Sequence, residues 1–158
     1  MEYDIMKNEE KIQLLKFNIS RFDHYYASVN FKSSFLVLGN LSLFSFLFLN
    51  KTGVNGVCII LSSVLSVLSL VFTLLAIAPY LKGNINYRSN IFFGEIANKT
   101  DFKNDIENLQ EKDYLDDLIE QNKYLSIGLK NKFELLNKAT WFFIFNIIVF
   151  LFTIIIFV

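Results

Sequence analysis

The stretch ATWFFIFNIIVFLFTIIIFV, residues 139–158, contains no charged side chain. Two further stretches share this property, residues 33–50 and residues 52–81. At about 1.5 Å of rise per residue, helices formed by these three stretches are roughly 30, 27 and 45 Å long, and the hydrocarbon core of a bilayer is about 30 Å thick. The sequence therefore predicts three transmembrane helices, which we place at residues 33–50, 55–80 and 139–158.

The composition of the chain is typical of a membrane protein. Hydrophobic residues make up 53% of its 158 residues, and 18 of them are Phe. Three uncharged stretches in so short a chain leave too little polar surface to cover them as buried core helices. The formal net charge is zero, which gives no overall attraction to nucleic acid. The single cysteine, Cys58, lies in an uncharged stretch and excludes a disulfide framework within the chain.

The distribution of Lys and Arg predicts how these helices are oriented. Five lie in residues 1–32 and nine in residues 82–138, whereas the connection between the first two spans has only Lys51. All Asp and Glu residues also lie in the first and third of these segments. We therefore expect residues 1–32 and 81–138 in the cytoplasm, and the 51–54 turn and the C-terminus on the outer side. Trp141, Tyr80 and Tyr87 lie where an interfacial aromatic belt is expected.

Apolar residues before the first span recur at steps of three and four, as in the seam of a coiled coil. They continue in phase into the span, and neither Pro nor Gly interrupts residues 8–38. The sequence therefore predicts one helix that starts within residues 1–32 and continues through span one. The residues of this seam are Ile12, Leu15, Ile19, Phe22, Tyr26, Val29, Ser33, Leu36, Asn40, Leu43 and Leu47.

The segment after the second span predicts further helices. Pro79 ends that span, and Thr100 suits the N-cap of a helix that opens with Asp101. From about Lys112 the pattern is helical again and continues into span three. One face of this helix carries Leu118, Leu125, Leu129 and Leu136. The expected fold is an all-α membrane protein, with three transmembrane helices and a small helical cytoplasmic lobe formed by extensions of spans one and three and by residues 82–138.

The polar segments contain no recognisable catalytic or metal site. There is one His, no Cys outside the spans, no cluster with metal-ligand spacing and no glycine-rich phosphate loop. His24 suits a structural role on the seam helix. The acidic residues Asp113, Asp116, Asp117 and Glu120 suit a solvated helix face. We therefore expect a protein that is not an enzyme and that binds neither a metal nor a cofactor.

The spans lack Asp, Glu, Lys, Arg and His, which argues against an ion-coupled carrier. They do contain neutral polar residues, several of which share one face of span two. Such residues serve either to pack helices closely through hydrogen bonds or to line a leak in an oligomer, and both roles stay open. The residues concerned are Asn40, Ser62, Ser66, Ser69, Thr73 and Asn146.

Two polar stripes in the cytoplasmic lobe are candidate binding surfaces. If the first and last helices pair, these stripes could supply cations for a phosphate, an amide for a base edge and a ring for stacking, which suits a small nucleotide. Two solvated faces with ordinary Lys and Arg at a membrane boundary are the alternative. The candidate ligand residues are Arg21, Tyr25, Lys32, Asp117, Gln121 and Lys132.

Several short blocks occur in a fixed order around the spans. They are NFKSS at 30–34, Pro79, NIFFGEIA at 90–97 followed by Phe102, Asp117-Leu118 to Gln121, Lys132-Phe133, and Ala139 at the start of span three. With these blocks, residues 20–145 resemble the transmembrane effectors of Pycsar, a bacterial anti-phage system. The chain has Asn30 where that family often has an acidic residue, and Tyr80 where it often has a basic one.

The resemblance implies a function. A partner cyclase would make a cyclic pyrimidine mononucleotide, cUMP or cCMP, during infection, and the cytoplasmic lobe would bind it. A homo-oligomer in the bilayer of the inner membrane would then impair membrane integrity and cause abortive infection, with no nucleic acid as partner. The alternative is a non-enzymatic membrane scaffold or accessory subunit whose lobe binds a protein.

Overall fold

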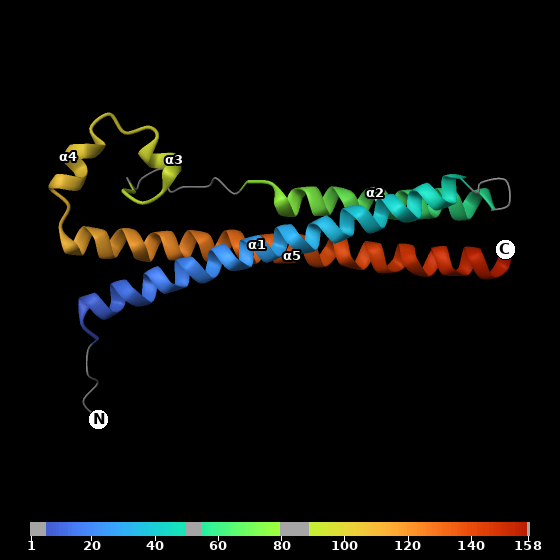
Figure 1. The fold of residues 1–158 in the computed structure, drawn as a ribbon, viewed down its shortest axis with the longest axis horizontal. Coiled ribbons are helices and arrows are strands. Elements are labelled where there is room, and N and C mark those ends of the chain that lie inside the picture. Colours follow the sequence, from blue (N-terminus) through green and yellow to red (C-terminus); the bar gives the residue numbers. More distant parts are fainter. Residues whose placement is uncertain (1–5, 50–54, 80–88, 158) are drawn as a thin grey trace, which may run out of the picture. The chain divides into compact units, whose positions relative to one another are not determined.

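The computed structural model describes residues 6–49, 55–79 and 89–157. Within these ranges the chain forms five helices and no strand (Figure 1). The helices are α1 (Asn8–Leu49), α2 (Gly56–Ile77), α3 (Phe93–Ile96), α4 (Phe102–Glu107) and α5 (Glu111–Phe157). Three of them, α1, α2 and α5, are long and apolar enough to cross a membrane. The expected all-α membrane fold is confirmed.

Residue contacts divide the chain into two compact units. The first comprises Met1–Tyr25 and Pro79–Leu129, and the second comprises Tyr26–Ala78 and Lys130–Val158. The helices α1 and α5 each contribute residues to both units. The first unit holds the short helices α3 and α4, and the second holds α2.

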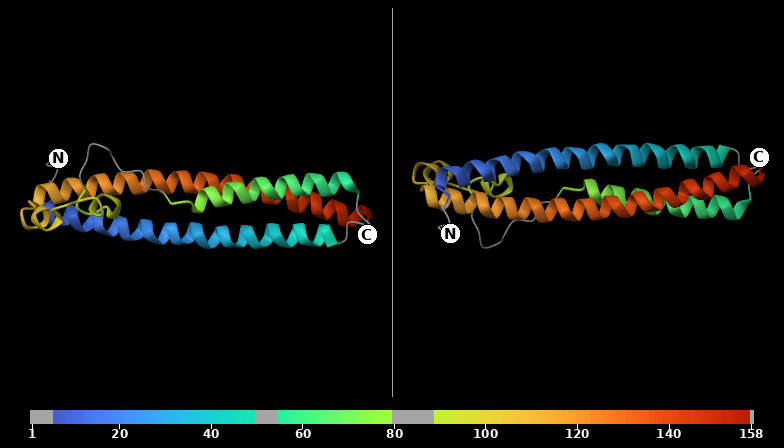
Figure 2. Two further views of the ribbon diagram at one scale, coloured as in Figure 1. Left: turned by 90° about the horizontal axis from the view of Figure 1, so that it is seen from above. Right: turned by 90° about the horizontal axis from the view of Figure 1, so that it is seen from below.

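The second unit is a bundle of three helical segments, from α1, α2 and α5, which lie side by side in both views of Figure 2. Ring contacts join α1 to α5 at Phe46 and Phe150, with centroids 5.2 Å apart, and α2 to α5 at Phe72 and Phe142, at 5.5 Å. A Cβ atom added to Gly39 of α1 would lie 2.5 Å from a Phe143 ring atom. Glycine therefore permits a close approach between α1 and α5.

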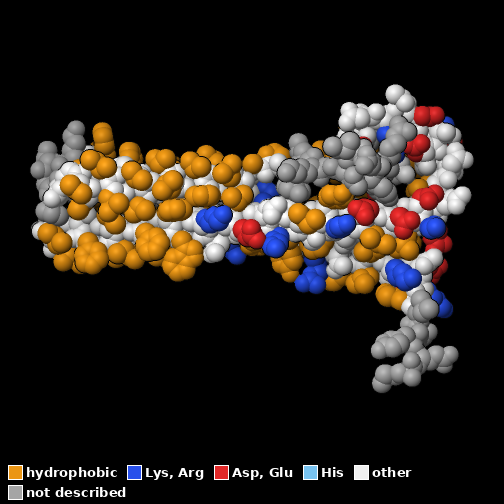
Figure 3. All heavy atoms as spheres, turned by 180° about the vertical axis from the view of Figure 1, so that it is seen from behind, with side chains coloured by type: hydrophobic (Ala, Val, Ile, Leu, Met, Phe, Trp, Pro, Cys, Tyr) orange, Lys and Arg blue, Asp and Glu red, His pale blue; other side chains and the backbone are white. Residues whose placement is uncertain are grey.

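The outer surface of this bundle is apolar. Side chains such as Val57 and Ile155 are 70% and 78% exposed, and many more large hydrophobic side chains are exposed on all three segments. On the face shown in Figure 3, hydrophobic side chains cover most of this unit. Exposed apolar surface of this extent needs an apolar environment, and a bilayer supplies one.

The predicted seam of the first helix faces inward. Val29, Ser33, Leu36, Asn40 and Leu47 are buried, and the remaining seam residues are half-buried. No break interrupts α1 between Asn8 and Leu49, as the absence of Pro and the periodicity predicted. Large apolar side chains between seam positions, such as Phe31, Phe35 and Leu38, are exposed, so this helix has apolar side chains on several faces.

The first unit packs the early part of α1 against the early part of α5. Leu118 and Leu129 are buried there, and Asn122 Nδ2 donates a hydrogen bond of 3.1 Å to the Leu15 carbonyl. The Lys16 ammonium lies 5.3 Å from the centre of the Tyr114 ring. These contacts join residues about one hundred positions apart in the sequence.

Helix ends differ from the expected ones in detail. The N-cap of α4 is Asp101, one residue later than the expected Thr100, and no side-chain hydrogen bond caps it. Ile77 is the last residue of α2, two positions before Pro79. The predicted 51–54 turn lies outside the described residues.

Of the predicted aromatic belt, Trp141 is about half exposed. Tyr80 and Tyr87 lie outside the described residues.

Candidate functional site

A row of neutral polar side chains is buried inside the second unit. Asn146 of α5 bonds to two serines of α2. Ser62 Oγ donates to Asn146 Oδ1 at 2.5 Å, and Asn146 Nδ2 donates to Ser66 Oγ at 2.7 Å. All three residues are at most 2% exposed. These hydrogen bonds hold the two helices in one register.

Ser69 extends this row and joins all three helices. Its Oγ donates to the Ala139 carbonyl of α5 at 2.9 Å and accepts from Asn40 Nδ2 of α1 at 2.8 Å. Thr73, one turn further along α2, donates to the Ser69 carbonyl at 2.8 Å. Asn40 Oδ1 is buried without a hydrogen-bond partner among the described residues.

The six span residues predicted for packing or leak lining are thus buried together. Apart from Asn40 Oδ1, their polar side-chain atoms hydrogen-bond between or within helices. A leak along this row would require the three helices to separate.

Lys132 is a residue of α5, and it is a buried cation that lies against the end of α2. Its ammonium donates two hydrogen bonds of 2.6 Å, to the carbonyls of Ala76 and Ala78. The residue is 7% exposed, and the ammonium lies 5.8 Å from the centre of the Tyr26 ring. The last carbonyls of a helix lack partners within the helix and carry partial negative charge, so a cation suits them. Burial lowers the pKa of Lys132 from its ordinary value.

Asp117 is a buried carboxylate in the first unit. Its two oxygens accept from Ser89 Oγ at 2.7 Å and from the Asn90 backbone amide at 2.6 Å. Ser89 Oγ in turn accepts from the amides of Ile91 and Phe92, at 3.0 and 2.9 Å. This set of contacts, the Asp117 clasp, attaches the segment that leads into α3 to α5.

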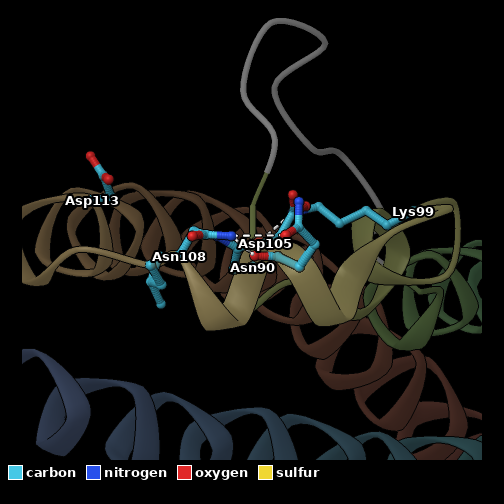
Figure 4. Close-up of a pocket in the computed structure, with 7 residues that line it drawn as sticks. Asn90, Lys99, Asp105, Asn108 and Asp113 are labelled. Carbon is cyan, nitrogen blue, oxygen red and sulfur yellow. Dashed lines mark hydrogen bonds and ion pairs between the residues drawn. The ribbon is translucent and has the colours of Figure 1, made fainter.

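A polar pocket of about 340 Å³ lies beside the clasp in the first unit (Figure 4). Lys99 forms an ion pair of 2.9 Å with Asp105 and also donates to the Asn90 side-chain oxygen. The Lys99 side chain is 4% exposed. The pocket is lined by Asn90, Lys99, Asn104, Asp105, Asn108, Leu109 and Asp113. Its amides and carboxylates could hydrogen-bond a polar ligand. In the described part of the chain, no group of three His, Cys, Asp or Glu residues could hold a metal ion.

The candidate ligand residues divide between the two units. In the first unit Arg21 donates to the Tyr25 hydroxyl at 2.9 Å on an exposed face, and Gln121 is half-buried. Asp117, in the same unit, is occupied by the clasp. In the second unit Lys32 is exposed, with its ammonium 5.9 Å from the Phe133 ring centre, and Lys132 is buried at the end of α2.

Comparison with known protein families decides the identity. The family model described as the Pycsar effector protein domain matches residues 14–158. The chain belongs to the Pycsar effector family. It is a membrane protein with a role in anti-phage defence. Neither the curated proteins nor the solved structures include a match to it.

Residues from several of the sequence blocks that resemble this family form contacts described above. Asn90, which opens the NIFFGEIA block, lies in the Asp117 clasp, and Lys132 lies at the end of α2. Sequence reasoning missed Ser89 and Lys99. A Ser placed just before a short apolar helix is a known turn and cap signal, whereas nothing in the sequence indicated that Lys99 is buried.

Proposed function

We propose that this Pycsar effector is activated by a cyclic pyrimidine mononucleotide, cUMP or cCMP, supplied by a partner cyclase. Once activated, it impairs the integrity of the inner membrane and so causes abortive infection. The family match over residues 14–158 carries this proposal. The three membrane-length helices support the membrane as the place of action.

The protein is proposed to act by binding and not by catalysis. It crosses the inner membrane three times, with residues 1–32 and 81–138 in the cytoplasm and the C-terminus outside, because Lys and Arg gather in those two segments. Several copies assemble in the bilayer, since the polar residues of a single three-helix bundle are buried and bonded to one another inside it.

Recognition of the nucleotide needs cations for the phosphate and a ring or amide for the base. In the first unit Arg21 and Tyr25 lie together on an exposed face and could supply a cation and a stacking ring. In the second unit Lys32 is exposed, whereas Lys132 would first have to leave the carbonyls of α2. Of the three candidate cations, Arg21 in the first unit and Lys32 in the second are therefore accessible without rearrangement.

Direct binding of cUMP, cCMP, cAMP and cGMP to detergent-purified protein tests the proposal. We expect a pyrimidine nucleotide to bind, and the variants Arg21→Ala and Lys32→Ala to weaken binding about tenfold or more, as for loss of a charged hydrogen bond. Lys130→Ala is the matched control, because Lys130 is an exposed lysine of the second unit that pairs only loosely with Glu134, at 3.9 Å.

In cells, uptake of a membrane-impermeant dye tests the same proposal. Uptake and loss of membrane potential are expected only when the nucleotide is supplied. If all four nucleotides fail to bind and leave dye uptake unchanged, the proposed activation is wrong. In that case, capture of a defined protein partner by the cytoplasmic lobe would favour the scaffold alternative. Normal nucleotide binding by both variants would remove Arg21 and Lys32 as contacts and leave the activation itself standing.

A further inference from the structure

The hydrogen bonds between α2 and α5 follow a regular spacing along α5, and the surface that they join is called the α2–α5 seam below. Lys132, Ala139 and Asn146 are seven residues apart, and each bonds to α2. Their partners run in the opposite direction along α2, from Ala78 and Ala76 through Ser69 to Ser66 and Ser62. Polar residues at such seam positions fix the register of paired helices at some cost in stability.

The hydrogen bonds of the α2–α5 seam differ in how easily water or an anion can replace one of their partners. Those of Ala139 and Asn146 lie within the uncharged stretch 139–158, where no water replaces a broken hydrogen bond. Lys132 lies outside that stretch and bonds to the last carbonyls of span two, where the span reaches the membrane boundary, so water or an anion can replace the Ala76 and Ala78 carbonyls as its acceptors. The seam therefore separates most readily from the Lys132 end.

The contact of Lys132 with α2 also competes with an anionic ligand. An ammonium has three donors, and two of them are already directed at carbonyls. Among the residues that the structure describes, no carboxylate forms an ion pair with Lys132. A phosphate accepts stronger hydrogen bonds from a cation than a neutral carbonyl does, and at 7% exposure the side chain can meet it only after leaving α2.

We propose that Lys132 is a positioning residue that holds the end of α2 against α5, and that an anionic ligand opens this seam by drawing Lys132 away. The ligand is the nucleotide only if the proposed function is right. A ligand shifts an equilibrium by its differential affinity for the two forms, and here a phosphate binds Lys132 only in the form with the seam open.

Hydrogen exchange at one amide reports the contact directly. The Ala78 amide donates to the Leu74 carbonyl at 3.0 Å in the last turn of α2. We expect Lys132→Met to speed exchange at Ala78 about tenfold, the equivalent of one to two lost hydrogen bonds. Lys132→Arg, which keeps charge and donors, is expected to stay near the wild-type rate, and Lys130→Met should have no effect.

The same variants are compared in cells. Lys132→Met is expected to cause dye uptake without any nucleotide, and Lys130→Met is not. An inserted Lys132→Met protein with wild-type Ala78 exchange and no such uptake would overturn the inference. If this variant does not insert, the wild type decides: once binding of cUMP or cCMP to the wild type has been measured, unchanged Ala78 exchange in the nucleotide-bound protein would equally overturn it. Faster exchange and uptake in Lys132→Met, combined with a wild type that binds no nucleotide, would contradict only the proposed ligand.

Discussion

Asn146 illustrates what a single polar residue does in an apolar bundle. It bonds to Ser62 and Ser66 of α2, and it is completely buried. In water such bonds are worth little, because the separated groups bond to solvent. Inside a membrane the separated groups lack that compensation, although measured values still average only about 0.6 kcal/mol and reach about 1.7. The effect of Asn146 is therefore on register more than on overall stability.

Replacement of Asn146 by Leu should destabilise the bundle by about 1 kcal/mol, because Ser62 loses its acceptor and Ser66 loses its donor. Unfolding in mixed detergent micelles, followed by circular dichroism, measures this change. Ser63→Ala is the matched control, since among the described residues Ser63 bonds within its own helix, to the Ile59 carbonyl at 2.7 Å. Equal losses in the two variants would show that Asn146 contributes no more than an ordinary helix serine.

At the scale of elements, two side chains of α5 attach other parts of the chain. Lys132 holds the end of α2, and Asp117 holds the segment that leads into α3. In both cases a buried charge meets the hydrogen-bonding needs of backbone outside its own helix. Such contacts stabilise the folded state, because removing the charged side chain leaves buried backbone groups without a hydrogen-bond partner.

Removal of the Asp117 carboxylate should loosen the segment before α3. In Asp117→Ala the amides of Asn90, Ile91 and Phe92 are expected to exchange hydrogen at least about tenfold faster, since the first loses its acceptor and the other two depend on Ser89. Asp116→Ala serves as control, because Asp116 is exposed on the same helix. Unchanged protection of all three amides would mean that the clasp does not hold this segment in solution.

At the scale of the whole molecule, the charge distribution predicts the direction of insertion. This prediction can be tested with single cysteines in a Cys58→Ser background. Gly56→Cys at the start of α2 should react from outside the cell with a membrane-impermeant maleimide, because a Cβ there has open space around it. Asp116→Cys should react only after the membrane is permeabilised. Reversed labelling of the two positions would overturn the proposed orientation.

Much of the fold and part of the candidate site could be predicted from periodicity. The seam of α1 and the leucine face of α5 came directly from steps of three and four, because burial of one helix face repeats with the helical turn. The serine face of α2 was recognised for the same reason. The partners of those serines could not be predicted, since Ser62 and Asn146 are 84 residues apart and no local pattern links them.

By itself, the sequence determined that this protein is a membrane-spanning helical chain of the Pycsar effector type, because uncharged length, charge asymmetry and ordered blocks are properties of the chain alone. Only the tertiary structure decided what Asp117 and Lys132 contact. Both look like solvated side chains in the sequence, yet each is buried against backbone 27 to 56 residues away. Burial of a charge depends on which backbone groups the fold brings to it, and helical periodicity carries no information about those groups.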